Sequence, residues 1–296
     1  MSSYKKRNTS TENKNSVVDG YLYLVATPIG NLSDISERAL KVLSEVDFIA
    51  AEDTRNTGLM LSRFGISKPM VSYFEHNKRE RGEMIAARLE AGESCALVTD
   101  AGTPAISDPG EDIVKLCAER GISVTSIPGC CAAITALTLS GLSTSRFTFE
   151  GFLSTAKNER RERLSELAPE KRTMIIYEAP HKLKNTLADL KKHFGDRKIA
   201  LCRELTKLNE DIHRTTIDGA IAYYEEHDPR GEYVLIIEGA PDDIAKTGYP
   251  DDPAEHVRLL EDGGLSRMDA IKAAAKERGV AKNEIYSAVM KKDGPK

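Results

Sequence analysis

Residues 21–51 read YLYLVATPIGNLSDISERALKVLSEVDFIAA, and the class of fold follows from their order. An apolar run, YLYLVA, is followed by a turn with Pro and Gly, then by apolar residues at the spacing of an amphipathic helix, and then by a second apolar run, FIAA. This order predicts a strand, a helix and a strand. Two strands joined through a helix lie parallel in one sheet, and helices cover both faces of such a sheet. We therefore expect an α/β fold.

The same alternation continues along most of the chain and divides it into two domains. Apolar runs at 70–74, 95–100 and 122–127 alternate with amphipathic stretches, which predicts a mainly parallel sheet over residues 20–141. After a short linker, the apolar runs FTFEGFL, TMIIYE, KIALCREL and EYVLIIEG predict a second α/β domain over residues 146–239. A length of 296 residues agrees with two domains, because domains most often have about 100–150 residues.

The remaining segments differ from the two domains in composition. Residues 1–19 combine Lys, Arg, Ser, Thr and Asn without an apolar run, which predicts a disordered tail rather than a secretory signal. Residues 240–262 contain seven acidic and two basic residues and are interpreted as an acidic linker. Residues 263–296 contain eight basic and four acidic residues. Two helical stretches broken at Gly279 predict a helical tail there that resembles a helix-turn-helix.

The composition narrows the classes of function. Lys and Arg number 42 against 46 Asp and Glu, so a nucleic-acid partner requires a local basic patch. Aromatic residues are 6% of the chain and Trp is absent, which leaves few platforms for base stacking. The cysteines form no C-x-x-C pair and the histidines are scattered, so we expect no disulfide, no metal and a reducing cytoplasm. The longest uncharged stretch, 121–145, is about half Gly, Pro, Ser and Thr, so we expect no membrane span.

Three loops after predicted strands of the first domain are candidates for ligand binding. They are TPIGN at 27–31, DAGTP at 100–104 and PGCCA at 128–132. The carboxyl ends of parallel strands meet at one edge of a sheet, and small residues there let a ligand approach the backbone. Asp100 is expected to accept a hydrogen bond from a ribose hydroxyl or an amino group, or else to cap its own turn. The chain lacks the dinucleotide-binding, P-loop, α/β-hydrolase and zincin motifs, which excludes those classes.

Charged residues follow other predicted strands. Glu52 and Asp53 come directly after FIAA, where they line the rim of the crevice. Alternatively, Asp53 or Thr54 caps the next helix, and the acidic residues favour its dipole. Glu204 and Lys207 follow a strand of the second domain and would face the crevice if the two sheets meet edge to edge. His181 follows Pro at a predicted helix start, a position where His is more often structural than substrate-binding.

Two basic segments are candidates for contact with phosphates. Lys157, Arg160 and Arg161 lie in KNERRER, whose mixed signs also suit a solvated helix face. The positive excess of the tail suits RNA, and equally a lid or a dimer contact. Its candidate residues are Arg267, Lys272 and Lys276.

Seven motifs then occur in a specific order, namely VATPIGNLSDIS, AEDTR, VTDAGTPAISDPG, IPGCCAAITAL, IYEAPHKL, RELTK and GEYVLIIEG. In their order and spacing the chain resembles the ribosomal RNA small subunit methyltransferase I family of the tetrapyrrole methylase superfamily. The resemblance implies two α/β domains of the tetrapyrrole methylase type with a cofactor cleft between them, usually in a homodimer. It further implies methyl transfer from S-adenosylmethionine to the ribose 2′-hydroxyl of a cytidine in the decoding region of 16S ribosomal RNA, in the small ribosomal subunit.

The resemblance also implies which residues contact the cofactor. They are Pro28, Asp100, Thr103, Cys131, Ala132 and Glu178. The chain departs from the family at Cys130, where Pro is more frequent. This departure affects the stiffness expected of the loop and leaves the small residues after it in place.

Several questions stay open at the level of sequence. No motif identifies a general base, and the candidates are Glu52, Asp53, Glu204 and Lys207. A methylase of a tetrapyrrole or another small molecule would share the cleft but would leave the basic tail without a purpose. A non-catalytic RNA-binding assembly factor would keep the tail and lack cofactor affinity. Because no base-stacking aromatic cluster is visible, we expect recognition of the shape of an assembled subunit.

Overall fold

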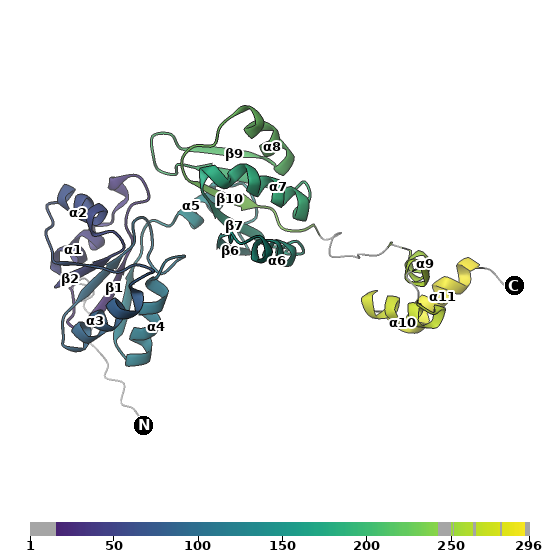
Figure 1. The fold of residues 1–296 in the computed structure, drawn as a ribbon, viewed down its shortest axis with the longest axis horizontal. Coiled ribbons are helices and arrows are strands. Elements are labelled where there is room, and N and C mark those ends of the chain that lie inside the picture. The colour runs from purple at the N-terminus through teal and green to yellow at the C-terminus, as the bar shows by residue number, and fades with distance from the viewer. Residues whose placement is uncertain (1–15, 242–249, 251, 263–264, 279, 294–296) are drawn as a thin grey trace, which may run out of the picture.

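The structure is a computed structural model that describes residues 16–241, 250, 252–262, 265–278 and 280–293. Figure 1 shows the sheets with their helices and, towards the C-terminus, a separate group of helices. Of the tail predicted at 1–19, residues 1–15 lie outside the described residues, and residues 16–19 lead into the first strand. Within the described residues, no helix has both the length and the apolar character needed to cross a membrane.

The first sheet is parallel throughout, with the strand order β3-β2-β4-β1-β5. Its strands are β1 (Tyr21–Val25), β2 (Phe48–Ala51), β3 (Met70–Ser72), β4 (Cys95–Val98) and β5 (Ser123–Ile127). The intervening helices are η2 (Leu32–Asp34), α1 (Glu37–Glu45), α2 (Thr54–Arg63), α3 (Lys78–Glu90) and α4 (Gly110–Arg120). The chain leaves β1 towards β2 and leaves the neighbouring β4 towards β5 on the other side. This reversal opens a crevice at the carboxyl ends of β1 and β4.

Both faces of this sheet are covered by helices. In β2, Ile49 and Ala51 join a core with residues of α1 and α2, whereas Phe48 and Ala50 join a second core with residues of α3 and α4. Side chains alternate between the faces along a strand, so an unbroken apolar run such as FIAA is typical of a strand buried on both sides. The predicted α/β fold with a parallel first sheet is confirmed.

The second sheet is mixed, with the strand order β6-β7-β10-β8-β9. Its strands are β6 (Phe147–Phe152), β7 (Thr173–Glu178), β8 (Lys198–Arg203), β9 (Asp211–Thr216) and β10 (Tyr233–Ile237). Strands β6 and β7 pair in parallel, and the other three pairings are antiparallel. Strand β9 is not apparent in the sequence, because DIHRTT is polar and forms a sheet edge, where it packs little apolar surface. Its helices are α6 (Lys157–Leu167), η3 (Pro180–Lys182), α7 (Leu183–Phe194) and α8 (Ile217–Glu226).

Helix α5 (Ala132–Leu139) follows the first sheet in sequence but packs on the second one. Its residues Ala133 and Leu137 share a core with Ile175 of β7 and Val234 of β10. Helices α6, α7 and α8 contribute to a separate core on the other face of the same sheet. Helix α5 therefore carries the loop after β5 to the boundary between the two sheets, where its label stands in Figure 1.

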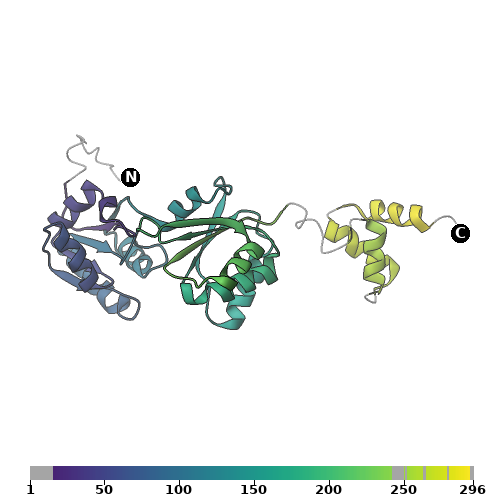
Figure 2. The same ribbon diagram turned by 90° about the horizontal axis from the view of Figure 1, so that it is seen from above.

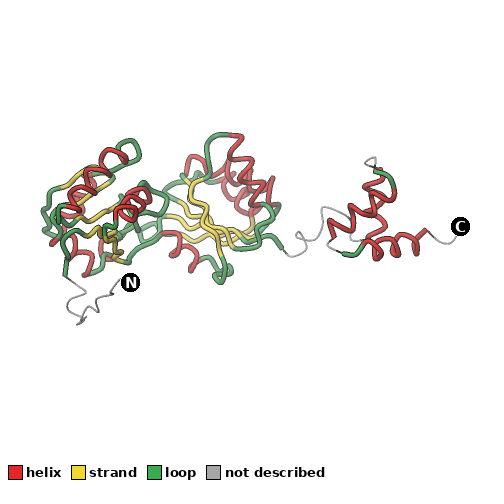
Figure 3. Tube along the Cα trace, turned by 90° about the horizontal axis from the view of Figure 1, so that it is seen from below, coloured by secondary structure: helices red, strands yellow, loops and turns green. Residues whose placement is uncertain are grey.

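Three helices form the third unit, namely α9 (Pro253–Asp262), α10 (Arg267–Arg278) and α11 (Lys282–Asp293). Val257, Ile271 and Ile285 are buried in a core that these helices share. Helix α9 thus lies inside residues 240–262, where the acidic composition predicts a linker, because its few apolar residues pack against α10 and α11. Figures 2 and 3 show the three helices apart from both sheets.

Candidate active site

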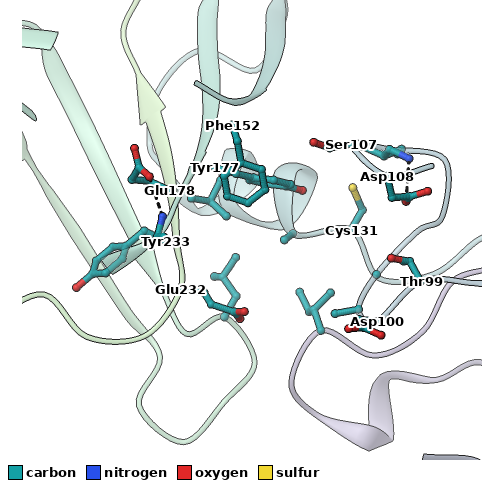
Figure 4. A pocket seen from close by; sticks show the side chains of 18 of the residues that line it. Thr99, Asp100, Ser107, Asp108, Cys131, Phe152, Tyr177, Glu178, Glu232 and Tyr233 are labelled. Atoms are coloured by element: carbon teal, nitrogen blue, oxygen red, sulfur yellow. Dashed lines mark hydrogen bonds between the residues drawn. The ribbon is translucent and has the colours of Figure 1, made fainter. Parts of the chain in front are cut away.

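A cleft of about 580 Å³ lies between the two sheets. Loops that follow β1, β4 and β5 of the first sheet contribute Ile29, Asp100 and Cys131 to its lining. From the second sheet, the end of β7 contributes Tyr177 and the start of β10 contributes Tyr233. Figure 4 shows these two groups of side chains facing one another across the cavity. The crevice expected at the strand ends is therefore closed by the second domain into a ligand-sized site.

The three small-residue loops are fastened to one another. Thr27 and Gly102 exchange backbone hydrogen bonds, with N···O distances of 2.9 and 3.1 Å. The hydroxyl of Thr103 donates to the carbonyl of Cys130 at 2.8 Å. Gly102 has φ +86°, a conformation that favours glycine, and lies against Ile29. The loops after β1, β4 and β5 thus form one connected floor to the cleft.

The second half of the loop after β4, before α4, is held in a strained conformation at the edge of the cleft. Ala105 and Ser107 adopt φ values of 67° and 64°, which are costly for residues with a Cβ. The carboxylate of Asp108 accepts hydrogen bonds from the backbone N–H groups of Ala105, at 3.0 Å, and of Gly110, at 2.7 Å. Ser107 and Asp108 line the cleft although neither was selected from the sequence. The available signal was the S-D-P-G turn at 107–110.

Most residues expected to contact the cofactor line this cleft. They are Asp100, Thr103, Cys131, Ala132 and Glu178. Pro28 is buried in its turn and does not line the cavity, and its neighbour Ile29 does. The Asp100 carboxylate is exposed and has no hydrogen-bonding partner among the described residues. It is therefore free to accept a hydrogen bond from a ligand.

The carboxylate of Glu178 is already engaged. Its side chain is buried, with 4% exposure of the residue, and accepts hydrogen bonds from the Ala179 N–H at 2.9 Å and from the Thr186 hydroxyl. A buried carboxylate with these partners orients the turn after β7, which also carries Pro180 and His181 into the lining. His181 is exposed and has no partner among the described residues.

Glu52 and Asp53 are adjacent in sequence but have different environments. Glu52 lines the cleft and accepts a hydrogen bond from the Thr99 hydroxyl at 3.0 Å. Asp53 does not line the cleft; it caps α2 by accepting from the Arg55 N–H at 2.8 Å and pairs with the Arg55 guanidinium at 2.7 Å. These hydrogen bonds from Arg55 lower the pKa of Asp53 to about 2. The structure thus gives Asp53 the role of a helix cap.

Lys207 lines the cleft with its ammonium held between two carboxylates. Its Nζ lies 2.9 Å from Oε1 of Glu204 and 2.9 Å from Oε2 of Glu232. Burial alone would lower the pKa of Lys207, but the hydrogen bonds to Glu232 and Glu204 outweigh it and raise the pKa. The lysine is therefore a cation at neutral pH and cannot accept a proton. Glu204 lies outside the lining, and Glu232, which was not selected from the sequence, lies within it.

Three aromatic rings pack together beside the cleft, and two of them, Tyr177 and Phe152, line it. The centroid of Tyr177 lies 5.1 Å from that of Phe149 and 5.5 Å from that of Phe152, and both pairs are edge to face. The Tyr177 hydroxyl accepts a hydrogen bond from the Ala133 N–H at 3.2 Å, and burial raises the pKa of Tyr177 to about 12. The sequence does not reveal this cluster, because its residues lie on two strands and meet only after folding. Whether it stacks a base is not tested by these contacts, so the expectation about base stacking stays a prediction.

The basic residues proposed for RNA contact differ in whether their side chains are exposed or already engaged within the domain. Lys157 and Arg161 are exposed and have no ion-pair partner among the described residues. Arg160 is engaged within the domain, because its guanidinium donates to Asp189 at 2.7 Å and to Thr186 at 2.8 Å. The candidates on α10 are exposed, and they are Arg267, Lys272 and Lys276.

The described residues contain no group of three or more His, Cys, Asp or Glu side chains arranged to hold a metal ion. The five cysteines are free thiols. The expected absence of a metal stays a prediction.

Comparisons with known proteins agree with this architecture. A family model described as Tetrapyrrole (Corrin/Porphyrin) Methylases matches residues 21–221. Ribosomal RNA small subunit methyltransferase I of Synechocystis sp. is 47% identical over 268 residues, which cover 90% of this chain and 96% of that protein. The protein of the same name from Escherichia coli O157:H7 is 43% identical over 294 residues, which cover 98% of this chain and 100% of that protein.

Solved structures with low sequence identity share the fold. Uroporphyrin-III-C-methyltransferase from Thermus thermophilus has a TM-score of 0.54 at 17% identity and covers 74% of this chain and 94% of its own. Diphthine synthase has a TM-score of 0.57 at 15% identity and covers 74% of this chain and 89% of its own. The family model and the close relatives together span most of the chain, and the chain therefore belongs to the ribosomal RNA small subunit methyltransferase I family of the tetrapyrrole (corrin/porphyrin) methylases.

Proposed function

We propose that this methyltransferase transfers a methyl group from S-adenosylmethionine to the ribose 2′-hydroxyl of a cytidine in 16S ribosomal RNA, in the decoding region of the small subunit. The observation that carries the proposal is the cleft between the two sheets, where the small-residue loops of the first domain face the aromatic and charged residues of the second. The close relatives named as ribosomal RNA small subunit methyltransferases support an RNA substrate.

The residues of the cleft suit the proposed cofactor. S-adenosylmethionine, when bound, supplies the methyl group on a positively charged sulfonium. The carboxylates of Asp100 and Glu52 favour positive charge in the cleft, and Asp100 is free to accept a hydrogen bond from a ribose hydroxyl or an ammonium group. Gly102 leaves the floor open to close approach, and Ile29 and Val234 give the walls an apolar surface for an adenine ring.

Positioning supplies more of the rate than proton transfer does. Alignment of two reactants removes about 7–11 kcal/mol from a barrier, whereas a general base contributes about 10²–10⁴-fold, or about 3–5 kcal/mol. Of the four candidates for the base, Glu52 alone lines the cleft without an ionic partner among the described residues. Lys207 is held as a cation, and Asp53 and Glu204 do not reach the cleft lining. We therefore retain Glu52 as the proton acceptor for the ribose hydroxyl.

Contacts with the RNA backbone rest on exposed basic residues outside the cleft. Lys157 and Arg161 occupy one face of α6, four residues apart, and Lys276 is exposed on α10. Such contacts contribute affinity without reading sequence, and they are sensitive to salt. We omit Arg160 from this surface, because Asp189 and Thr186 occupy its guanidinium. The expected homodimer stays a prediction.

The proposal is tested by transfer of labelled methyl groups and by mapping of ribose methylation. Purified protein with labelled S-adenosylmethionine is expected to label isolated small ribosomal subunits on a ribose, and cells that lack the protein are expected to lack one ribose methylation in this RNA. The Asp100→Asn variant is the matched comparison: its side chain has the same size but no charge, and its cofactor site is expected to be weaker. Label on a porphyrinoid instead of RNA would identify a small-molecule methylase. Binding to subunits without affinity for the cofactor would identify an assembly factor.

A further inference from the structure

The end of strand β6 contains a bulge that reorients one aromatic side chain. Phe149 and Phe152 pair with Ile175 and Tyr177 of β7, which are two residues apart, so β6 holds one extra residue between them. An extra residue reverses the alternation of side chains, and Phe149 and Phe152 therefore lie on the same face of the sheet. Gly151, in the bulge, has φ +60°, which glycine adopts without strain. Without this bulge Phe152 would point to the opposite face, against α6 and α7.

The ring of Phe152 is supported from behind and open in front. Tyr177 packs its ring at 63° to that of Phe152, and Tyr177 is itself fixed by Phe149 and by the N–H of Ala133. Phe152 nevertheless keeps 59% exposure while lining the cleft. Figure 4 shows it projecting into the cavity in front of Tyr177. A large apolar side chain held open in a functional cleft indicates a contact surface for a ligand.

The charge of the cleft limits which part of an RNA enters it. One lysine, Lys207, and His181 are the basic residues in the lining. The acidic residues that line the same cavity are Glu52, Asp100, Asp108, Glu178 and Glu232. This excess of carboxylates repels phosphate groups and tolerates an uncharged base and ribose. The phosphates of a bound strand therefore stay outside, where exposed Lys157 and Arg161 follow Phe152 in sequence by five and nine residues.

We propose that Phe152 is the platform on which the base of the target nucleotide stacks after that nucleotide leaves its neighbours and enters the cleft. The inference rests on the proposed function and adds to it the part of the RNA that the cleft receives. Proteins that recognise unpaired RNA bind bases that are splayed out of their stack, and aromatic side chains replace the lost stacking. Enzymes that act on a base in a duplex also take the nucleotide out of its stack. Stacking on Phe152 holds the base at the opening of the cleft and its ribose towards the floor, where Asp100 and Glu52 lie.

The test compares three variants with the full-length protein. Phe152→Ala removes the ring, Phe152→Tyr keeps a ring of the same size, and Phe147→Ala removes a phenylalanine with 39% exposure that lies at the other end of β6 and outside the cleft. Each is assayed for kcat/KM with small ribosomal subunits, for the affinity of S-adenosylmethionine by calorimetry, and for stability by urea unfolding. Base stacking on an aromatic ring corresponds to about a 5- to 150-fold effect.

The expected pattern separates stacking from other roles. Phe152→Ala is expected to lose about 5- to 150-fold in kcat/KM for subunits and to keep the cofactor affinity and the stability of wild type. Phe152→Tyr is expected to retain most of the activity, and Phe147→Ala all of it. Unchanged kcat/KM in Phe152→Ala, or a parallel loss of cofactor affinity that would place the ring against the cofactor, overturns the proposal. Failure of the proposed function is a separate outcome, because it requires that the wild-type protein itself transfers no methyl group to subunits.

Discussion

Gly30 lies where the loop after β1 meets the second domain, and its replacement by Ala tests whether that contact shapes the cleft. A Cβ at this position would lie 2.5 Å from Cγ of Lys207, 2.8 Å from Oγ1 of Thr206 and 2.9 Å from the carbonyl oxygen of Leu205. Real carbon atoms do not approach so closely, and the carbonyl belongs to the backbone. The loop containing Leu205 and Thr206 must therefore move away from the first domain.

The size of the effect follows from these contacts. Overpacking costs about 1–3 kcal/mol. Displacement also breaks the hydrogen bond at 3.0 Å from the Asn31 N–H to the Thr206 hydroxyl, which is worth about 0.5–1.5 kcal/mol. We therefore expect Gly30→Ala to weaken the contact between domains by about 2–4 kcal/mol. Because both loops border the cleft, we expect S-adenosylmethionine to bind at least about tenfold more weakly, which corresponds to about 1.4 kcal/mol.

Two measurements check this expectation. Urea unfolding is followed by circular dichroism, because the chain has no Trp, and cofactor affinity is measured by calorimetry. The control is Gly82→Ala in α3, where a Cβ would make ordinary contacts at 3.6 Å from Leu116 and 3.7 Å from Tyr73. This control is expected to be neutral or to stabilise the protein by about 0.5–1 kcal/mol, as Ala does in helices. Wild-type stability and wild-type cofactor affinity in Gly30→Ala would refute the reasoning.

Three further predictions use other parts of the molecule. Asp100→Ala removes the free carboxylate of the cleft and should weaken cofactor binding about 10- to 150-fold, as measured by calorimetry. Asp53→Ala removes a helix cap instead. It should cost about 1 kcal/mol of stability and leave the cofactor affinity unchanged. Replacement of Lys157 and Arg161 by Gln should flatten the plot of log affinity for subunits against log salt by about 0.7–0.9 per lost phosphate contact, and an unchanged slope would exclude them from the RNA surface. Hydrogen bonds from the Arg172 side chain lower the pKa of Glu170 from 4.5 to about 2. The ionised Glu170 therefore stabilises the folded state by about 1 kcal/mol after screening. This contribution is present above pH 4.5 and is lost as the pH falls towards 2. The difference in unfolding free energy between wild type and Glu170→Gln should therefore vanish in acid.

The first sheet could be predicted because each of its elements is encoded locally. The run FIAA is buried on both faces, and its apolar character is independent of which helix covers it. Strand β9 could not be predicted in this way, because it is polar and its pairing with β8 depends on a hairpin formed at the sheet edge. Helix α5 is visible in the sequence, but its packing on the second sheet is not, since an apolar helix fits any uncovered apolar face.

The candidate site was predicted in part for the same reason. Asp100 and Thr103 follow a strand in a loop of small residues, and strand ends of a parallel sheet meet at one edge, so sequence order alone brings them together. Glu204 and Lys207 also follow a strand, so the sequence predicts a place at the cleft for them as well. Their partners include Glu232, which is distant in sequence, and this contact turns Lys207 into a held cation.

The order of apolar runs, helical stretches and small-residue loops was enough to establish the α/β class, the position of the ligand loops and the family. These features depend on the spacing of residue types within one element, and that spacing is written in the chain. The direction of Phe152, the pairing of Lys207 with Glu232 and the closure of the cleft around Gly30 were decided by contacts between residues far apart in sequence. A single bulge, one hydrogen-bond partner or one close approach changes the role of a side chain, and each of these forms only when separate elements pack together.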